Sequence, residues 1–432
     1  MTRPHSPDSP TAPSAGPADQ SGVLRRALAD PAALADHPPA EPPPLPDSPL
    51  LGQWLQAATG PLAEAMRTPQ AFRLQILLGL VVPGPGGRPV LQQHGFRVDA
   101  EYIYPASTVK LCAAAGALLF LRHLAAATGR PITRRTPLRF HPCFPDQSVI
   151  DHDPDNLDGQ TITVESDIRK IALVSDNPAH NRLYTLLGHR RINHLMWALG
   201  LPSVRINHRL SEFRPRDEQR RTGAVDLLIP DGSAPLTLPQ QHSNLLLDNA
   251  GVPRTGIGTA HVPPGGTLAN RIDQPLDCSW RNRFGLADMQ RLLALLVRPD
   301  LVPDNPIAAD LLPTDDRKAL LAAMTQFPGD SPSPVYSRDR WPDHCCKFFL
   351  PGLRRVLPAD RVRVVNKVGR AYGFSIENAY CFDTVTGRPF FLAAALEANP
   401  SGLVGFDGYA DAAFADPLLA DLGELVARKV WA

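Results

Sequence analysis

Tyr104-Pro105-Ala106-Ser107-Thr108-Val109-Lys110 runs directly into an apolar segment at residues 111–120. Proline suits the entry to a helix and the Ala and Leu residues that follow are good helix formers, so Ser107 is predicted to open a buried helix. At a spacing of three, Ser107 and Lys110 share one helix face. A serine hydroxyl needs a base to take its proton, and burial lowers the pKa of a lysine towards that role. The stretch predicts a nucleophile and its base, although a helix-capping serine one turn before a lysine is also an ordinary surface pattern.

The composition limits the class of protein. The chain has 432 residues, 43% of them hydrophobic, and a formal net charge of +1, enough for one large domain or two smaller ones. A near-neutral charge argues against nucleic acid as the main partner. No apolar run is expected to reach the length of a membrane span, and residues 1–6 lack the apolar region of a secretory signal. The six cysteines show no CxxC spacing, so neither a zinc site nor another cofactor is expected.

The chain is expected to have a tether and one folded domain. Residues 1–48 are rich in Pro, Ser, Asp and Ala, which predicts a disordered tether. The remaining residues, 49–432, are predicted to form the domain. Strands are predicted at 72–82, 90–98, 361–369, 374–382 and 389–396, with a closing helix at 417–430. The sheet part therefore comprises about 70–107 and 361–432, and the helical part about 108–350, with an insertion rich in Gly, Pro, Asn and Asp at 223–283.

Two further motifs follow the Ser107 stretch. Ser175-Asp176-Asn177 separates a predicted helix, which Thr163 caps, from a second helix beginning at Pro178. These three residue types also make plain turns, so the motif gains meaning only from its position. Lys367-Val368-Gly369 lies on the predicted strand at 361–369. Acidic residues at 151, 153 and 155 depart from a calcium loop at its sixth and twelfth positions, which favours an acidic surface loop.

With these three motifs in order, the chain resembles the serine β-lactamase and penicillin-binding protein superfamily. It is most similar to class A β-lactamases over residues 157–183, and the resemblance covers about residues 70–432 unevenly. The resemblance implies an α+β fold, with an antiparallel five-stranded sheet flanked by helices and an inserted helical subdomain. The hairpin before Ser107 and the strands after residue 361 fit that arrangement.

The resemblance also implies roles for single residues. Ser107 would be acylated, with Lys110 as its activating partner, and Ser175 would pass a proton to the leaving nitrogen. Asn177 would hold the amide side chain of the substrate, and Lys367 would supply positive charge. The backbone N–H groups of Ser107 and Arg370 would form the oxyanion hole beside Gly369.

The chain departs from the family pattern at two places. Val368 stands where the family has a hydroxyl residue, and a methyl group cannot donate a hydrogen bond to a substrate carboxylate. Glu212 is the best candidate for the glutamate that drives deacylation in class A enzymes. An equally weighted interpretation is a surface carboxylate paired with Arg209 or Arg214. The asparagine that normally follows this glutamate is missing, so deacylation is the step most in question.

The main hypothesis is a class A-like serine hydrolase that opens a β-lactam or related amide through an acyl-enzyme. The alternatives are a cell-wall D,D-peptidase, transpeptidase or esterase of the same fold, and a non-catalytic binding protein with a degenerate site. The expected partner is a small β-lactam, peptide or ester substrate, and a monomer is expected. The insertion at 223–283 is expected to wall the substrate cleft. The family resemblance suggests a periplasmic or extracellular location, although no signal peptide is visible.

Overall fold

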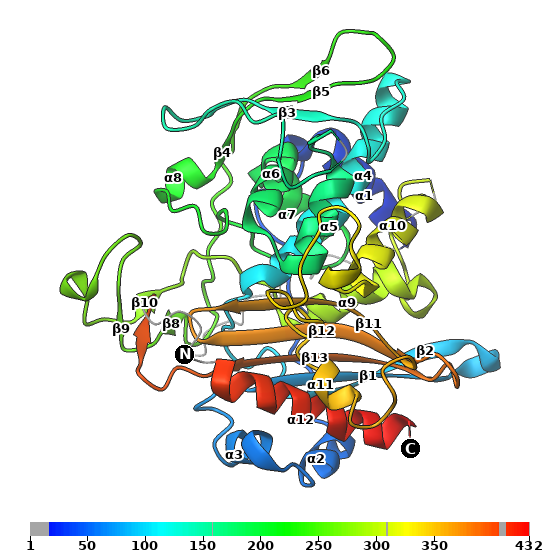
Figure 1. Ribbon diagram of the computed structural model, residues 1–432, viewed down its shortest axis with the longest axis vertical. Helices are drawn as coiled ribbons and strands as arrows, with labels where there is room; N and C mark the ends of the chain where they lie inside the picture. Colours follow the sequence, from blue (N-terminus) through cyan, green and yellow to red (C-terminus); the bar gives the residue numbers. More distant parts are fainter. Residues whose placement is uncertain (1–16, 158, 308–309, 406–411, 432) are drawn as a thin grey trace, which may run out of the picture.

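The computed structural model describes residues 17–157, 159–307, 310–405 and 412–431, and this part of the chain is built around one sheet (Figure 1). Figure 1 shows four helices below a five-stranded sheet, namely α2 Pro49–Leu55, α3 Gly60–Arg67, α11 Leu350–Leu353 and α12 Ala412–Trp431. The remaining helices lie above it. This mixed helix and sheet architecture confirms the predicted α+β fold class.

The sheet joins strands from both ends of the chain. Its order is β11-β12-β13-β1-β2, and every neighbouring pair is antiparallel. The strands are β1 Gln75–Pro83, β2 Pro89–Phe96, β11 Val362–Ala371, β12 Phe374–Asp383 and β13 Pro389–Glu397. The five strands predicted from the sequence lie at these positions. Because β13 and most of β1 are buried on both faces, they read in the sequence as continuous apolar runs instead of alternating ones.

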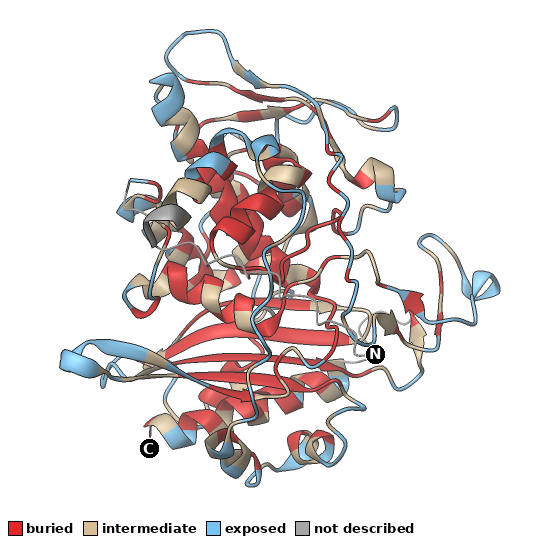
Figure 2. Cartoon of the chain, turned by 180° about the vertical axis from the view of Figure 1, so that it is seen from behind, coloured by how far each residue is buried: buried red, intermediate tan, exposed pale blue. Residues whose placement is uncertain are grey.

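The two faces of the sheet contribute to two separate hydrophobic cores. Phe391, Ala393 and Ala395 on β13 belong to the core on the side of the helical body, whereas Leu392 and Ala394 belong to the core beneath α12. This division follows from the alternation of side chains along a strand. Figure 2 shows most of the sheet as a buried layer between the two sets of helices, with the end of the β1–β2 hairpin exposed.

Helix α4, Lys110–Thr128, is the centre of the helical body, and its residues 110–121 are all buried. Together with the turn before it, the segment Ala106–Thr128 is long and apolar enough, by length and composition, to cross a membrane. The sequence-based statement that no such run exists is therefore wrong. The physical reason for the apolar composition is visible in the fold, because α4 packs against its neighbours on every side over 110–121.

The other helices of the upper body surround α4 (Figure 1). They are α1 Pro17–Ala29, α5 Val164–Val174, α6 Asn177–Leu187, α7 His189–Ala198, α8 Arg216–Gln219, α9 Leu286–Val297 and α10 Thr314–Thr325. Thr163 caps α5 as predicted, because its side chain accepts a hydrogen bond from the Ser166 N–H and the Ser166 hydroxyl returns one to the Thr163 backbone. Helix α9 lies directly on the sheet, against β12 and β13.

The amino-terminal segment differs from the predicted tether where the structure describes it. Residues 17–29 form α1, which packs against α7 and α4 and buries Leu24, Ala27 and Leu28 completely. Three apolar residues on one helix face are enough to dock a short helix, although the surrounding prolines dilute the hydrophobic signal in the sequence. Residues 1–16 of the predicted tether lie outside the described residues.

The segment 223–283 consists of short strands and loops. Strand β5 Val225–Leu227 pairs with β3 Leu138–Phe140 and β6 Leu236–Leu238. Further short pairs join β4 Arg221–Thr222 to β7 Gln241–His242, β8 Gly256–Ile257 to β10 Leu276–Asp277, and β9 Ala260–His261 to β14 Leu403–Val404. These pairings bring the end of the segment alongside the sheet.

Candidate active site

Ser107 lies in a short 3₁₀ turn, Ala106–Val109, that leads directly into α4. The sequence predicts that Ser107 opens the α-helix, whereas the structure places it in the turn just before. Residues three apart are eclipsed in a 3₁₀ turn, so Ser107 and Lys110 still share one side. Ala106 has a φ of 47°, which is in the left-handed region that a residue with a side chain rarely adopts. Such strain is often found at functional sites.

Lys110 is fully buried, and its amine faces the junction between α5 and α6. Its Nζ donates to Asn177 Oδ1 at 2.6 Å, to Ser175 Oγ at 3.2 Å and to the Ser175 carbonyl oxygen. Burial, and then the positive charge of Lys367, hold the pKa of Lys110 well below its ordinary value. A neutral amine is therefore available at a lower pH than in an exposed lysine, which is the state that accepts a proton from a hydroxyl.

The α5–α6 junction directs Ser175 and Asn177 towards that amine. Ser175 ends α5 with a φ of 57°, in the left-handed region, so the chain turns sharply there. Asp176 then caps α6 by accepting a hydrogen bond from the Ala179 N–H at 2.7 Å. The two caps fix the direction of the three-residue motif, and both of its outer side chains contact Lys110.

Lys367 reaches the same hydroxyl from strand β11. Its Nζ donates to Ser175 Oγ at 2.9 Å and to the Val368 carbonyl oxygen at 2.9 Å. Burial lowers the pKa of Lys367 to about 8. Ser175 Oγ therefore accepts hydrogen bonds from two lysine amines, which leaves its own proton free to be donated. Lys367 thus meets Ser175, from which it is separated by 192 positions in the sequence, at this one oxygen atom.

Gly369 allows β11 to approach the Ser107 turn closely. A Cβ atom at this position would lie 2.6 Å from the Pro105 carbonyl oxygen and 3.0 Å from the Ser107 nitrogen. Any residue other than glycine would therefore push the strand away from the turn. Arg370, next along the strand, directs its guanidinium to Asp416 and donates from Nε to Ser375 Oγ at 2.9 Å. Its side chain is thus turned towards α12.

The structure places Val368 away from substrate. Val368 is buried among the apolar residues beneath the sheet and is not one of the residues that line the cavity beside Ser107. Alternation along β11 explains this, because Lys367 and Gly369 face the helical body and Val368 faces the opposite side. Its side chain therefore does not contact ligand in this cavity, which differs from the sequence-based expectation.

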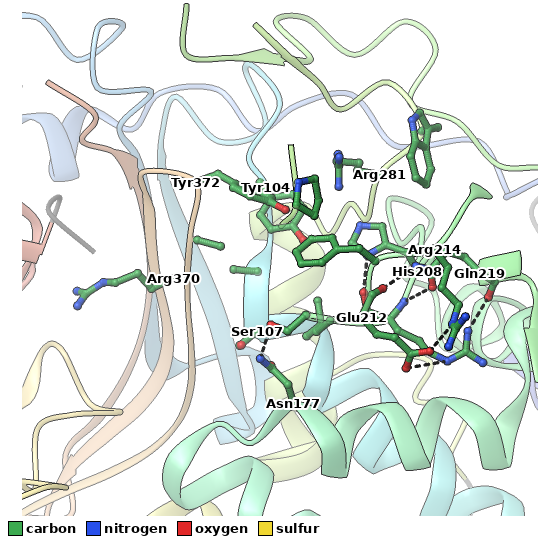
Figure 3. A pocket seen from close by; sticks show the side chains of 18 of the residues that line it. Tyr104, Ser107, Asn177, His208, Glu212, Arg214, Gln219, Arg281, Arg370 and Tyr372 are labelled. Carbon is green, nitrogen blue, oxygen red and sulfur yellow. Dashed lines mark hydrogen bonds and ion pairs between the residues drawn. The ribbon is translucent and has the colours of Figure 1, made fainter. Parts of the chain in front are cut away.

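Ser107 and Asn177 open into a cavity of about 480 Å³ (Figure 3). Its walls come from the Ser107 turn, the end of α5–α6, the segment 208–215, the segment 370–372 and three residues of the insertion, Pro264, Trp280 and Arg281. Figure 3 shows Ser107 and Asn177 at one end and Arg281 at the other. The volume is that of a small-molecule site, and the side chain of Ser107 is one of the hydroxyl groups on its wall.

The comparisons with known proteins agree with this arrangement. Residues 93–234 match the model of the β-lactamase enzyme family, and this segment contains Ser107, Lys110, Ser175 and Asn177. Over this segment the chain is therefore similar to the serine β-lactamases. A search of curated proteins found no significant match.

Solved β-lactamase structures align with most of this chain. One from Desulfarculus baarsii has 16% sequence identity and a TM-score of 0.47, and the alignment covers 89% of this chain and 98% of that one. One from Xanthomonas campestris has 19% identity, a TM-score of 0.45 and coverages of 89% and 97%. The class A β-lactamase from Mycobacterium abscessus has 16% identity, a TM-score of 0.44 and coverages of 86% and 99%.

Glu212 lines the cavity and is also paired with arginine. Its carboxylate lies 2.7 Å from Arg214 Nε and 3.7 Å from Arg209 Nε, and it accepts a hydrogen bond from Gln147 Nε2 at 3.4 Å. Figure 3 shows Glu212 between Ser107 and Arg214. The ion pairs that the sequence analysis weighed are thus both present, and the carboxylate still faces the cavity.

Asn181 holds the loop that carries Glu212. Its Oδ1 accepts from the Leu210 N–H and its Nδ2 donates to the Leu210 carbonyl oxygen, each at 3.0 Å. Sequence analysis gave this residue no role. A polar residue one helical turn after Asn177 on α6 is a signal for an inward-facing contact, but the identity of its partner depends on the tertiary fold.

The acidic segment near residue 153 is tied to the helices that carry the Ser175 motif. Asp153 Oδ2 lies 2.6 Å from Lys170 Nζ and 3.1 Å from Arg182 Nη2, and Arg182 also pairs with the buried Asp167. These carboxylates therefore have cationic side-chain partners. Asp151 and Asp155 are exposed, as expected for an acidic surface loop, while Asp153 links α5 to α6 through these ion pairs.

Sequence analysis also missed the aromatic wall of the cavity. Tyr104, His208, Trp280 and Tyr372 line it from four separate segments. Tyr104 lies 4.8 Å from Tyr372 and 6.2 Å from His208 between ring centroids, and His208 lies 6.1 Å from Trp280. No local pattern announces such a cluster, because each ring is isolated in the sequence. Trp280 in a segment otherwise rich in Gly, Pro and Asn was the one available signal.

Proposed function

We propose that this chain is a class A-like serine hydrolase that opens a β-lactam or related amide through an acyl-enzyme on Ser107. The observation that carries the proposal is the buried pair of lysines that share the Ser175 hydroxyl beside the Ser107 turn. Two amines with lowered pKa values on one hydroxyl form a route for moving a proton. The more general part of the proposal, that the chain is a β-lactamase-like hydrolase, is supported by the family match over residues 93–234.

In the proposed acylation step, the neutral amine of Lys110 takes the Ser107 proton as Ser107 Oγ bonds to the carbonyl carbon. The tetrahedral intermediate then collapses, the carbon–nitrogen bond breaks, and the nitrogen receives a proton from the Ser175 hydroxyl. Lys110, which donates to Ser175 Oγ, returns the proton to that oxygen. Lys367 stays protonated and supplies positive charge beside the reacting atoms.

The backbone N–H groups of Ser107 and Arg370 are the proposed oxyanion hole. The close approach of Gly369 to the Ser107 nitrogen supports this assignment, because it fixes β11 against the turn that presents Ser107. Fixed donors stabilise the negative oxygen of the tetrahedral intermediate without reorganising during the reaction. Asn177 accepts from Lys110 through Oδ1 and donates from Nδ2 to Ser211 Oγ at 2.7 Å, and its second amide proton is proposed to bind the acyl side chain of a substrate.

Intact-mass spectrometry tests the proposal directly. The wild-type protein is incubated with benzylpenicillin and with a chromogenic cephalosporin, and its mass is followed over time. We expect a mass increase equal to the whole β-lactam, located by proteolysis on the peptide that contains Ser107. A transient adduct with turnover supports a β-lactamase. An adduct on another residue, or neither adduct nor turnover with any β-lactam, would contradict the proposal.

Glu212 is the proposed base for deacylation, and we expect Glu212→Gln to slow that step while leaving acylation in place. A general base contributes about 10²–10⁴-fold in rate. The same mass assay should therefore show an adduct that persists at least about a hundred times longer in the variant. Arg214→Gln is the matched control, because it frees the Glu212 carboxylate from its 2.7 Å ion pair without removing it. Equal adduct lifetimes in Glu212→Gln and wild type would exclude Glu212 as the base.

One observation favours a second candidate, a D,D-peptidase or transpeptidase of the same fold. The Glu212 carboxylate is held by two arginines, and a carboxylate held in this way is not free to activate water. Enzymes that transfer the acyl group to an amine do not need that base. A persistent wild-type adduct that an added D-amino acid releases would favour this second function over the first.

A further inference from the structure

Four arginines line the cavity, and among the described residues Arg281 differs from the other three in having no carboxylate partner. Its charged lining residues are Arg209, Glu212, Arg214, Arg281 and Arg370. Arg209 and Arg214 pair with Glu212, Arg214 also pairs with Asp146, and Arg370 pairs with Asp416. Among the described residues, Arg281 is in no ion pair with a carboxylate. The one hydrogen bond recorded for its guanidinium is from Nε to the main-chain oxygen of Asp277, at 3.2 Å.

The Arg281 guanidinium lies over aromatic rings of the cavity. Its Cζ is 5.3 Å from the centroid of the Trp280 ring and 5.8 Å from that of Tyr372. Burial raises the pKa of Tyr104 and of Tyr372, and the Arg281 charge opposes this rise in both tyrosines. The positive charge of Arg281 is therefore close enough to influence groups that line the cavity. The rings hold the guanidinium by cation–π contact while its edge remains available for hydrogen bonds.

Hydrogen bonds from buried asparagine side chains hold the turn that carries Trp280 and Arg281. Asn207 Nδ2 donates to the Trp280 carbonyl oxygen at 2.8 Å, and Asn249 Nδ2 donates to the Arg281 carbonyl oxygen at 3.1 Å. Asn282 Oδ1 accepts from the N–H groups of Asn207 and His208 at 2.7 and 3.0 Å. These three asparagines are buried, so Arg281 is held in place before any ligand arrives. Such preorganisation lowers the entropic cost of binding.

We propose that Arg281 is a specificity residue, which binds a carboxylate on the part of the substrate remote from the bond that Ser107 attacks. An aromatic or apolar linker of the substrate would lie against Tyr104 and Tyr372, between Ser107 and Arg281 (Figure 3). An arginine matches a carboxylate because its planar N–H groups can donate two parallel hydrogen bonds. The inference rests on the proposed function in one respect, namely that Ser107 is the residue that attacks the substrate.

The test measures binding, so that it does not depend on catalysis. Phenylacetate and its neutral analogue phenylacetamide are titrated by calorimetry into wild type, Arg281→Ala, Arg281→Lys and Arg216→Ala. Arg216 is the matched control, because its Cζ lies 5.8 Å from the same Trp280 ring but it is not among the cavity-lining residues. Thermal unfolding of each variant checks that the turn remains folded.

We expect wild type and Arg216→Ala to bind phenylacetate about tenfold more tightly than phenylacetamide. Arg281→Ala should lose that preference, and Arg281→Lys should keep part of it. An absence of preference in wild type, or a preference that survives Arg281→Ala, would overturn the inference. If the preference depends on Arg281 but no β-lactam acylates Ser107, the anion site stands and the proposed function fails. In a catalytically active protein, the same preference should appear in kcat/KM for carbenicillin over benzylpenicillin, which differ by one side-chain carboxylate.

Discussion

Ser107→Ala should abolish both the covalent adduct and turnover, with a loss in kcat/KM of at least about 10⁴-fold. The variant keeps the Lys110 and Ser175 hydrogen bonds, because those contacts do not involve the Ser107 hydroxyl. The substitution removes the Ser107 hydroxyl, which lines the cavity and belongs to the turn just before Lys110. Initial rates with a chromogenic cephalosporin, together with intact-mass measurements, report the loss.

The matched control is Ser233→Ala, which removes an exposed hydroxyl outside the residues that line the cavity. Its activity should equal that of wild type. The Ser107→Ala protein should also unfold within a few degrees of wild type, because deletion of one partly exposed hydroxyl rarely changes stability by more than about 1 kcal/mol. Residual turnover above a tenth of the wild-type rate in a folded Ser107→Ala protein would remove Ser107 from the mechanism.

The part of the site nearest to Ser107 was predictable from local spacing. Ser107 and Lys110 lie three residues apart, and the apolar run behind them requires a buried helix, so both the contact face and the lowered pKa of Lys110 follow from neighbouring residues. The strands were equally predictable, because burial of β13 on both faces leaves a continuous apolar run. In each case the physical cause acts over a few residues.

The rest of the site depends on contacts between distant segments. Lys367 meets Ser175 across 192 positions, and only the order of the three family motifs suggested that they would meet. Arg281 could not be placed at all, because its position depends on buried asparagines at 207, 249 and 282 that hold the turn by side-chain hydrogen bonds. Helix α1 was missed for a related reason, since the prolines around it concealed the three apolar residues that dock it.

The side-chain direction of Val368 could have been predicted in part from the sequence. Alternation along the strand requires Val368 to face away from Lys367 and Gly369. The sequence analysis treated the three residues as one motif, with Lys367 as a catalytic residue and with Val368 and Gly369 at the substrate. Their positions in the structure separate them, with Lys367 at the Ser175 hydroxyl, Gly369 against the Ser107 nitrogen and Val368 in the core beneath the sheet.

Lys110→Met should reduce the rate of acylation by about 10²–10⁴-fold, which is the usual contribution of a general base. Methionine keeps most of the length of the side chain but removes the amine that donates to Asn177 and Ser175. Lys347→Met is the matched control, because its amine is also buried and donates to Asn366 Oδ1 at 2.8 Å and to two carbonyl oxygens. Both variants lose a buried amine, so both should lose stability, whereas the large loss of acylation should be confined to Lys110→Met.

The pH dependence of acylation gives the sharper test of the two lysines. The mechanism needs Lys110 neutral, so the rate should rise as the pH increases through the pKa of Lys110, which burial and then the Lys367 charge place well below its ordinary value. It also needs Lys367 protonated, and burial lowers the pKa of Lys367 to about 8, so the rate should fall as the pH passes about 8. The profile should therefore be bell-shaped, with its alkaline limb near pH 8.

Lys367→Arg separates the two limbs of that profile. A guanidinium stays protonated far above pH 8, so the variant should retain its rate at alkaline pH while the acidic limb, which belongs to Lys110, stays in place. Stopped-flow measurement of adduct formation between pH 5 and pH 10 is the appropriate readout, because it isolates acylation from the later steps. If the rate of Lys367→Arg still falls near pH 8, that fall is caused by the titration of another group. The proposal that the reaction needs Lys367 for its positive charge would then be wrong.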